Sequence, residues 1–79
     1  MALKTSARNR LPGVVTTIKL GDIMAQVDIR VGDNHIVSII TREAADELGL
    51  KEGDHVIAII KSTEVMVGKA EGEEAHFGI

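Results

Sequence analysis

An alternation of apolar and polar side chains over residues 23–31 constrains the fold of this chain more than any other feature. Every second position is apolar and the positions between are mostly polar; the apolar set is Ile23, Ala25, Val27, Ile29 and Val31. Because successive side chains of a strand point to opposite faces, this period of two predicts a strand with one buried face. The residues that follow, 32–34, are Gly-Asp-Asn and have the composition of a turn. We therefore predict a hairpin whose second strand covers residues 35–41.

A helical pattern replaces the alternation after Thr41. Ala44, Ala45 and Leu48 recur at the spacing of one helix face, with charged residues on the other faces. Thr41 can cap the N-terminus of a helix, and Gly49 stands where a two-turn helix needs a left-handed residue. The sequence thus predicts one short helix between Thr41 and Gly49.

Three other segments have the short length and the apolar, β-branched composition that favour strands. They cover residues 11–20, 55–61 and 64–67. Five short strands with one helix between the third and the fourth are the layout of an all-β, OB-like barrel. We expect this five-stranded barrel to be a single domain over residues 1–69, followed by an acidic tail over residues 70–79.

The small size of the chain predicts that it associates with other subunits. The chain has 79 residues and no cysteine. A domain of this size buries only roughly 60% of its unfolded surface, so its core needs a supplement. Disulfides are excluded by the lack of cysteine, as are thiolate metal sites and cysteine nucleophiles. Oligomerisation is the supplement that remains.

Charge and residue types exclude several classes of function. The formal net charge is −3 and Phe77 is the one aromatic residue, which argues against nucleic-acid binding. The three histidines, His35, His55 and His76, do not have metal-ligand spacing, and no nucleophile stands beside a base. We therefore expect neither an enzyme nor a metal centre. No apolar run approaches the ~20 residues that span a bilayer, so we expect a cytoplasmic protein.

Short polar and cationic residues lie at the ends of the predicted elements. Residues 6–9 (SARN) precede the first strand, Thr41 opens the helix, and residues 61–63 (KST) follow the fourth strand. Hydroxyls and the N–H groups of a helix N-terminus donate hydrogen bonds, and Arg and Lys supply charge, which together suit a tetrahedral anion. From the residues alone, the ordinary interpretation, a terminal arm, a helix cap and a strand end, is favoured over an anion site.

Four segments closely resemble the molbindins, the small molybdate- and tungstate-binding proteins built on the Mop or TOBE domain. They occur in that family's order and spacing, and the resemblance covers about residues 4–69. The segments are SARNRLPG (6–13), KLGDIMA (19–25), ITREAADELGL (40–50) and AIIKSTEVM (58–66).

The resemblance implies a hexamer, a trimer of dimers, that holds oxyanions at subunit interfaces with no metal cofactor of its own. One subunit would supply four donors, with Asn9 holding the arm in place; the donors are Ser6, Arg8, Lys61 and Ser62. The partner subunit would supply Thr41 and the backbone at Glu43 and Ala44. Many relatives have serine where this chain has Ala44, so one hydroxyl is missing. The family also has a second class of site, which the resemblance assigns to residues 19–24.

The function implied is reversible binding of molybdate or tungstate for intracellular storage, buffering or homeostasis. One alternative is an accessory domain of a larger regulator or transporter ATPase. The other is a DNA-binding, swapped-hairpin transcription regulator, which residues 40–54 also resemble. The negative net charge and the absence of a basic arm argue against DNA binding.

Overall fold

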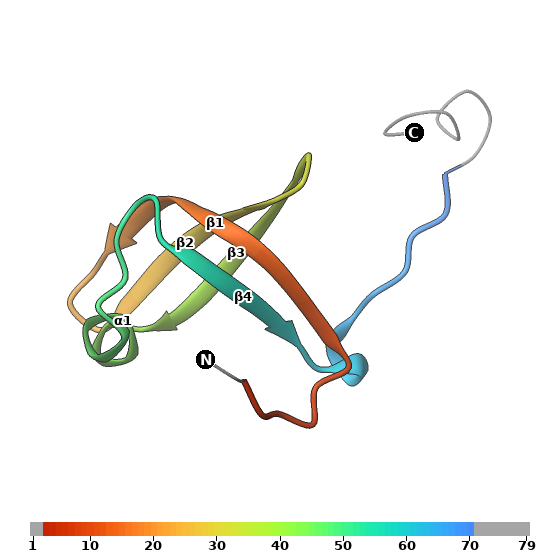
Figure 1. Cartoon of the computed structure of the whole chain (residues 1–79), viewed down its shortest axis with the longest axis horizontal. Helices are drawn as coiled ribbons and strands as arrows, with labels where there is room; N and C mark the ends of the chain where they lie inside the picture. The colour runs from red at the N-terminus through yellow and green to blue at the C-terminus, as the bar shows by residue number, and fades with distance from the viewer. Residues whose placement is uncertain (1–2, 71–79) are drawn as a thin grey trace.

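The computed structural model describes residues 3–70 of the chain. These residues form one antiparallel sheet of four strands, one α-helix and one 3-10 turn (Figure 1). In chain order the elements are β1 (Asn9–Leu20), β2 (Met24–Val31), β3 (Asn34–Thr41), α1 (Arg42–Leu48), β4 (His55–Ile60) and the 3-10 turn η1 (Ser62–Glu64). The strand order in the sheet is β3-β2-β1-β4, so β3 and β4 are its two edges.

The predicted hairpin is confirmed, because β2 pairs with β3 along its whole length. The alternation in β2 directs Ala25, Val27 and Ile29 into the interior, where none is more than 6% exposed. Val27 and Ile29 form the buried core cluster together with Val15 of β1 and Ala58 of β4. The core is small and consists of aliphatic side chains, as expected for a chain of this length.

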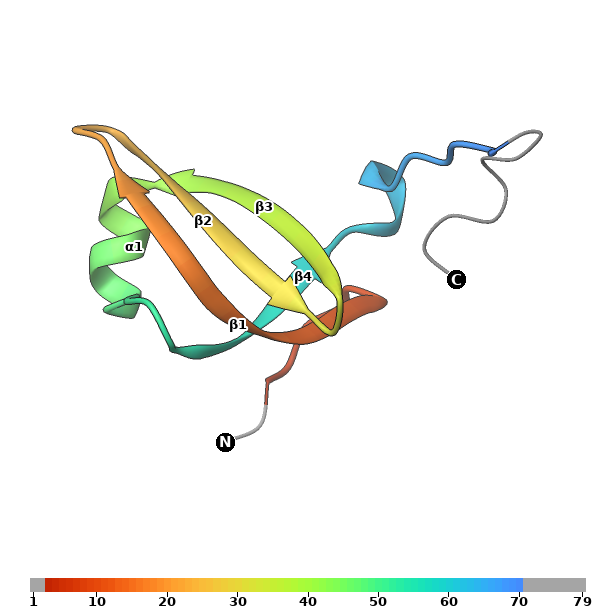
Figure 2. The same cartoon turned by 90° about the horizontal axis from the view of Figure 1, so that it is seen from above.

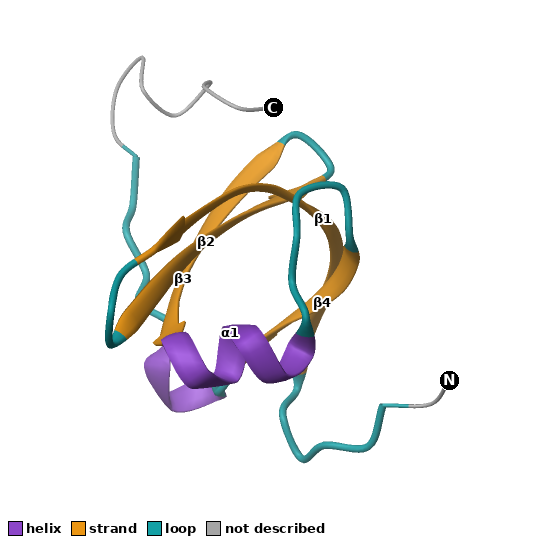
Figure 3. Cartoon of the chain, turned by 90° about the vertical axis from the view of Figure 1, so that its left-hand side faces the viewer, coloured by secondary structure: helices purple, strands orange, loops and turns teal. Residues whose placement is uncertain are grey.

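β1 bends because it belongs to two ladders and contains a bulge. Its N-terminal half pairs with β4, and a register shift between Val15 and Thr17 interrupts its pairing with β2. At the bulge, the Val15 N–H donates to the Asp54 carbonyl (2.9 Å) and the Gly53 N–H donates to the Val15 carbonyl (2.8 Å). A bulge bends a strand and increases its twist. The sheet therefore curls, and β3 and β4 face each other across the interior (Figures 2 and 3).

The predicted helix is confirmed with both of its caps. The Thr41 hydroxyl oxygen accepts a hydrogen bond from the Ala44 N–H (3.0 Å), and Gly49 ends α1 with a φ of 62°. Ala45 is the buried residue of α1, and the helix lies across one end of the curled sheet (Figure 3). No helix within residues 3–70 is long and apolar enough to cross a membrane.

The expected fifth strand is absent from the described residues. Residues 62–64 form η1, and residues 65–70 have no regular structure. The chain after β4 runs away from the sheet (Figure 1), so its backbone groups have no strand to pair with. The sheet therefore has four strands and stays open between β3 and β4, and the barrel is not closed within this chain. From residue 71 onward, the expected acidic tail lies outside the described residues.

Candidate functional site

The predicted donors of one subunit lie on two segments that leave the sheet at the same point. Asn9 is the ladder partner of Ile60, and its side-chain amide donates to the Ile60 carbonyl (3.2 Å). Ser6 and Arg8 come just before this pair and Lys61 and Ser62 just after it, and all four are exposed. Asn9 is half-buried and holds the two segments together. We call this place the arm junction.

The arm junction carries positive charge without a neutralising carboxylate. Within residues 3–70, the ion pairs are Arg42 with Asp46 and His35 with Asp28, and neither lies at the junction. Arg8 and Lys61 therefore form no ion pair there. Hydrogen bonds between cationic side chains and an anion are about twice as strong as neutral ones. The junction is suited to an anion.

The predicted donors at the helix start lie at the other end of β1. Thr41 is the last residue of β3, and the residue before it, Ile40, pairs with Ala25 of β2. Ala25 also pairs with Leu20, the last residue of β1, so Thr41 lies near the C-terminal end of β1. β1 has 12 residues, so at a rise of about 3.3 Å per residue its ends can be as much as ~36 Å apart. Figure 1 shows α1 and the arm junction at opposite ends of the sheet. One subunit thus brings Ser6, Arg8, Lys61 and Ser62 together but keeps Thr41, Glu43 and Ala44 apart from them.

Two of the first three N–H groups of α1 already have acceptors. The Arg42 N–H donates to the Ile23 carbonyl (2.7 Å), and the Ala44 N–H donates to the Thr41 hydroxyl oxygen. For the Glu43 N–H, residues 3–70 offer no acceptor. Of the two backbone groups implied by the resemblance, Glu43 is therefore the free donor, while the Ala44 N–H serves the helix cap.

Arg42 makes two side-chain contacts that were not predicted from the sequence. Its guanidinium donates to the Gly21 carbonyl (3.1 Å) and to the Asp46 carboxylate (3.2 Å), so it ties the turn before β2 to α1. An i,i+4 pair of arginine and aspartate was visible in the sequence. The contact to Gly21 was not, because it joins residues 21 positions apart.

An apolar groove of about 740 Å³ lies between β3 and β4. Side chains from both edges line it, among them Ile36, Ile40, Val56, Ala58 and Ile60. Close by in the chain, Val65, Met66 and Val67 are 49%, 92% and 93% exposed. The subunit thus has an open apolar groove and an exposed apolar segment that does not fill it.

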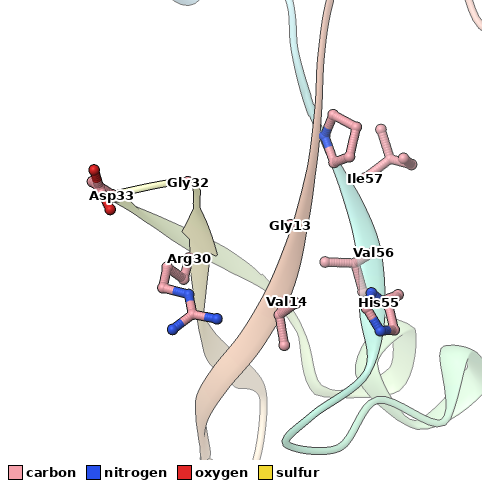
Figure 4. Close-up of a pocket in the computed structure, with 9 residues that line it drawn as sticks. Gly13, Val14, Arg30, Gly32, Asp33, His55, Val56 and Ile57 are labelled. Atoms are coloured by element: carbon pink, nitrogen blue, oxygen red, sulfur yellow. The ribbon is translucent and has the colours of Figure 1, made fainter.

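A second hollow, of about 770 Å³, lies elsewhere and contains none of the predicted donors. Arg30 and His55 line it on the two sides of Val14 (Figure 4). No cluster of three histidine, aspartate or glutamate side chains that could hold a metal ion occurs in residues 3–70. The hollow is open, and its side chains do not converge on one point.

Comparison with known proteins identifies the class of this domain. Residues 5–67 match the model of the TOBE domain. The chain is 47% identical over 66 residues to molybdenum-pterin-binding protein 1 of Clostridium pasteurianum, covering 82% of this chain and 97% of that protein. It therefore belongs to the TOBE-domain family and, within it, to the Mop proteins, or molbindins.

Two solved structures have the same fold. The molybdate-binding protein of Sporomusa ovata superposes with a TM-score of 0.81 at 36% identity, over 85% of this chain and all of that one. The cytoplasmic molybdate-binding protein ModG, solved with molybdate bound, gives a TM-score of 0.73 at 38% identity, over 76% of this chain and 43% of that one. The four-stranded sheet and the short helix are thus those of Mop structures.

Proposed function

We propose that this protein reversibly binds molybdate or tungstate at the interfaces between its subunits, and that it serves to store, buffer or balance the anion in the cell. The observation that carries the proposal is the separation of two donor sets at opposite ends of β1. Each set is incomplete, and the cations of the first set, Arg8 and Lys61, form no ion pair within residues 3–70. The relatives are named as proteins that bind molybdenum-pterin or molybdate. These names supply the chemical identity of the anion and favour an anion over DNA as the ligand. No bond in the protein is made or broken, so the protein is a binder and not an enzyme.

In the proposed site, Arg8 and Lys61 compensate the charge of the dianion. The hydroxyls of Ser6 and Ser62 donate beside them, and the partner subunit adds the Thr41 hydroxyl and the Glu43 N–H. Thr41 can serve both the cap and the anion, because its oxygen accepts from the Ala44 N–H while its own proton stays available. Discrimination rests on size: sulfate is smaller than molybdate and leaves some donors out of reach.

Exchange of the C-terminal segment provides the assembly that the site needs. Val65, Met66 and Val67 of one copy enter the groove between β3 and β4 of another, where they form the missing strand and close the barrel. Burial of each large apolar side chain contributes about 1.5–3 kcal/mol, and closure removes two exposed sheet edges. The resulting dimer is the unit of the proposed hexamer, a trimer of dimers. We place the protein in the cytoplasm, as the relative ModG is.

Native mass spectrometry with and without molybdate tests this function. The expected spectrum shows a homo-oligomer of even subunit number, which takes up molybdate in a fixed ratio to its subunits. A monomer that binds molybdate, or an oligomer that binds none at millimolar concentration, would contradict the proposal. Sulfate at the same ionic strength is the control, and it should add no mass.

A further inference from the structure

We infer that the bound anion locks the exchanged segment in place, so that anion occupancy controls how fast subunits exchange between oligomers. The inference rests on the proposed function and adds regulation of the same site. We call residues 61–67 the C-terminal arm. Its first two residues, Lys61 and Ser62, are proposed anion ligands, and its last three are the apolar residues proposed to enter the partner.

The backbone links the ligands directly to the apolar residues. The Glu64 N–H donates to the Lys61 carbonyl (2.9 Å), which closes the single 3-10 turn η1, and Val65 follows without an intervening residue. No other hydrogen bond involves residues 61–67 within the described part of the chain. The direction of the arm therefore depends on the backbone of Lys61 and Ser62, through which the chain leaves β4. Fixing these two residues on an anion fixes the arm.

The charges at the arm junction also make the position of the arm depend on a bound anion. Lys4, Arg8, Arg10 and Lys61 all lie on the two segments that meet at Asn9 and Ile60, and all are exposed. No carboxylate within residues 3–70 pairs with them. Without an anion these like charges repel one another across the junction. A dianion between Arg8 and Lys61 turns the repulsion into attraction and holds Lys61, the first residue of the arm, beside the start of β1.

Linkage sets the size of the effect. If the complete site exists only while the arm is docked, molybdate favours the docked state by a factor of 1 + [L]/Kd, roughly 100-fold at a concentration of 100 times Kd. The coupling is reciprocal, so a change that weakens arm docking must also weaken molybdate binding. Met66 is suited to this test because it is 92% exposed and is not a proposed ligand.

Subunit exchange between ¹⁵N-labelled and unlabelled full-length protein, followed by native mass spectrometry, tests the inference. Molybdate at 100 times its Kd should slow exchange at least tenfold, whereas sulfate at equal ionic strength should not. Calorimetry on the same samples separates the two proposals. Molybdate that binds to the oligomer without slowing exchange overturns the inference and leaves the proposed function standing. Absence of binding overturns both.

A pair of substitutions at Met66 tests the reciprocal direction. Met66→Gln should speed exchange and raise the Kd for molybdate several-fold at concentrations where the oligomer is intact, because a polar side chain docks poorly in an apolar groove. Met66→Leu keeps the apolar volume and should change neither quantity by more than about twofold. Faster exchange in Met66→Gln with an unchanged Kd would overturn the coupling.

Discussion

Replacement of Arg8 by alanine should abolish most of the affinity for molybdate while leaving the fold intact. Arg8 is exposed, and its side chain makes no hydrogen bond or ion pair within residues 3–70. Substitutions at such positions change stability by no more than about 0.5 kcal/mol. The expected shift of Tm without molybdate is therefore less than about 4 °C.

The loss of affinity follows from the charge on the guanidinium. A hydrogen bond to a charged group contributes about 1.5–3 kcal/mol, which corresponds to a rise of roughly 10- to 150-fold in Kd. Isothermal titration calorimetry measures Kd, and thermal unfolding followed by circular dichroism measures stability. Lys51→Ala is the matched control, because Lys51 is also exposed and cationic but lies in the loop between α1 and β4. A Kd for Arg8→Ala within twofold of the wild type, in a folded oligomer, would refute the assignment of Arg8 to the site.

Three further substitutions test other parts of the structure. Ala44→Ser adds the hydroxyl that the resemblance to the molbindins implies at this position, so calorimetry should give a Kd lower by up to about tenfold, in line with one added hydrogen bond. A higher Kd would count against placing this residue at the anion. Gly13→Ala should lower the free energy of unfolding, measured by urea denaturation, by about 1–3 kcal/mol. The added Cβ would lie 2.6 Å from the Arg30 carbonyl oxygen and 2.7 Å from Ile29 Cγ2. Unchanged stability would contradict that packing. Thr41→Ala removes the helix cap and should cost about 1 kcal/mol in the same assay, and it should also weaken molybdate binding, whereas Thr41→Ser should do neither.

The hairpin and the helix were predictable because their signals are local. A period of two over nine residues followed by a turn leaves one arrangement of β2 and β3 that buries the apolar face. Thr41 and Gly49 bracket α1 by the side-chain and backbone chemistry of helix caps alone. Ile23 marks the limit of this reasoning. It continues the alternation in the sequence, yet it lies before β2 and is 76% exposed.

The fifth strand could not be predicted reliably, because a strand is defined by its partner. Residues 64–67 have a strand-like composition, but in this subunit they meet no free edge. The bulge near Val15 bends β1, and this bend leaves the groove between β3 and β4. No local sequence pattern predicts that groove. The same holds for the candidate site. The arm junction depends on the pairing of Asn9 with Ile60, which are 51 residues apart, and no local signal in the sequence specifies that pairing.

The binding role of the donors at the helix start stays a prediction, but the structure shows which of their groups are already engaged. Thr41 was expected both to cap the helix and to bind the anion, and the cap is present. The resemblance implied backbone donors at both Glu43 and Ala44. Since one N–H cannot serve two acceptors equally well, the cap at Ala44 leaves Glu43 as the stronger donor. A sequence shows which residues can donate, but not which of their groups are already engaged.

Complementation between two inactive variants tests the central claim, that the anion lies between subunits. Arg8→Ala lacks the guanidinium that should bind the anion. Thr41→Asp keeps an oxygen that caps the helix, but it places a negative charge where the Thr41 hydroxyl should donate to the anion. Each variant alone should bind molybdate weakly. After refolding of an equal mixture, calorimetry should recover tight binding at about one quarter of the sites, those that pair an intact Arg8 with an intact Thr41 across an interface. Recovery of no tight sites, in mixed oligomers verified by mass spectrometry, would contradict a site shared between subunits.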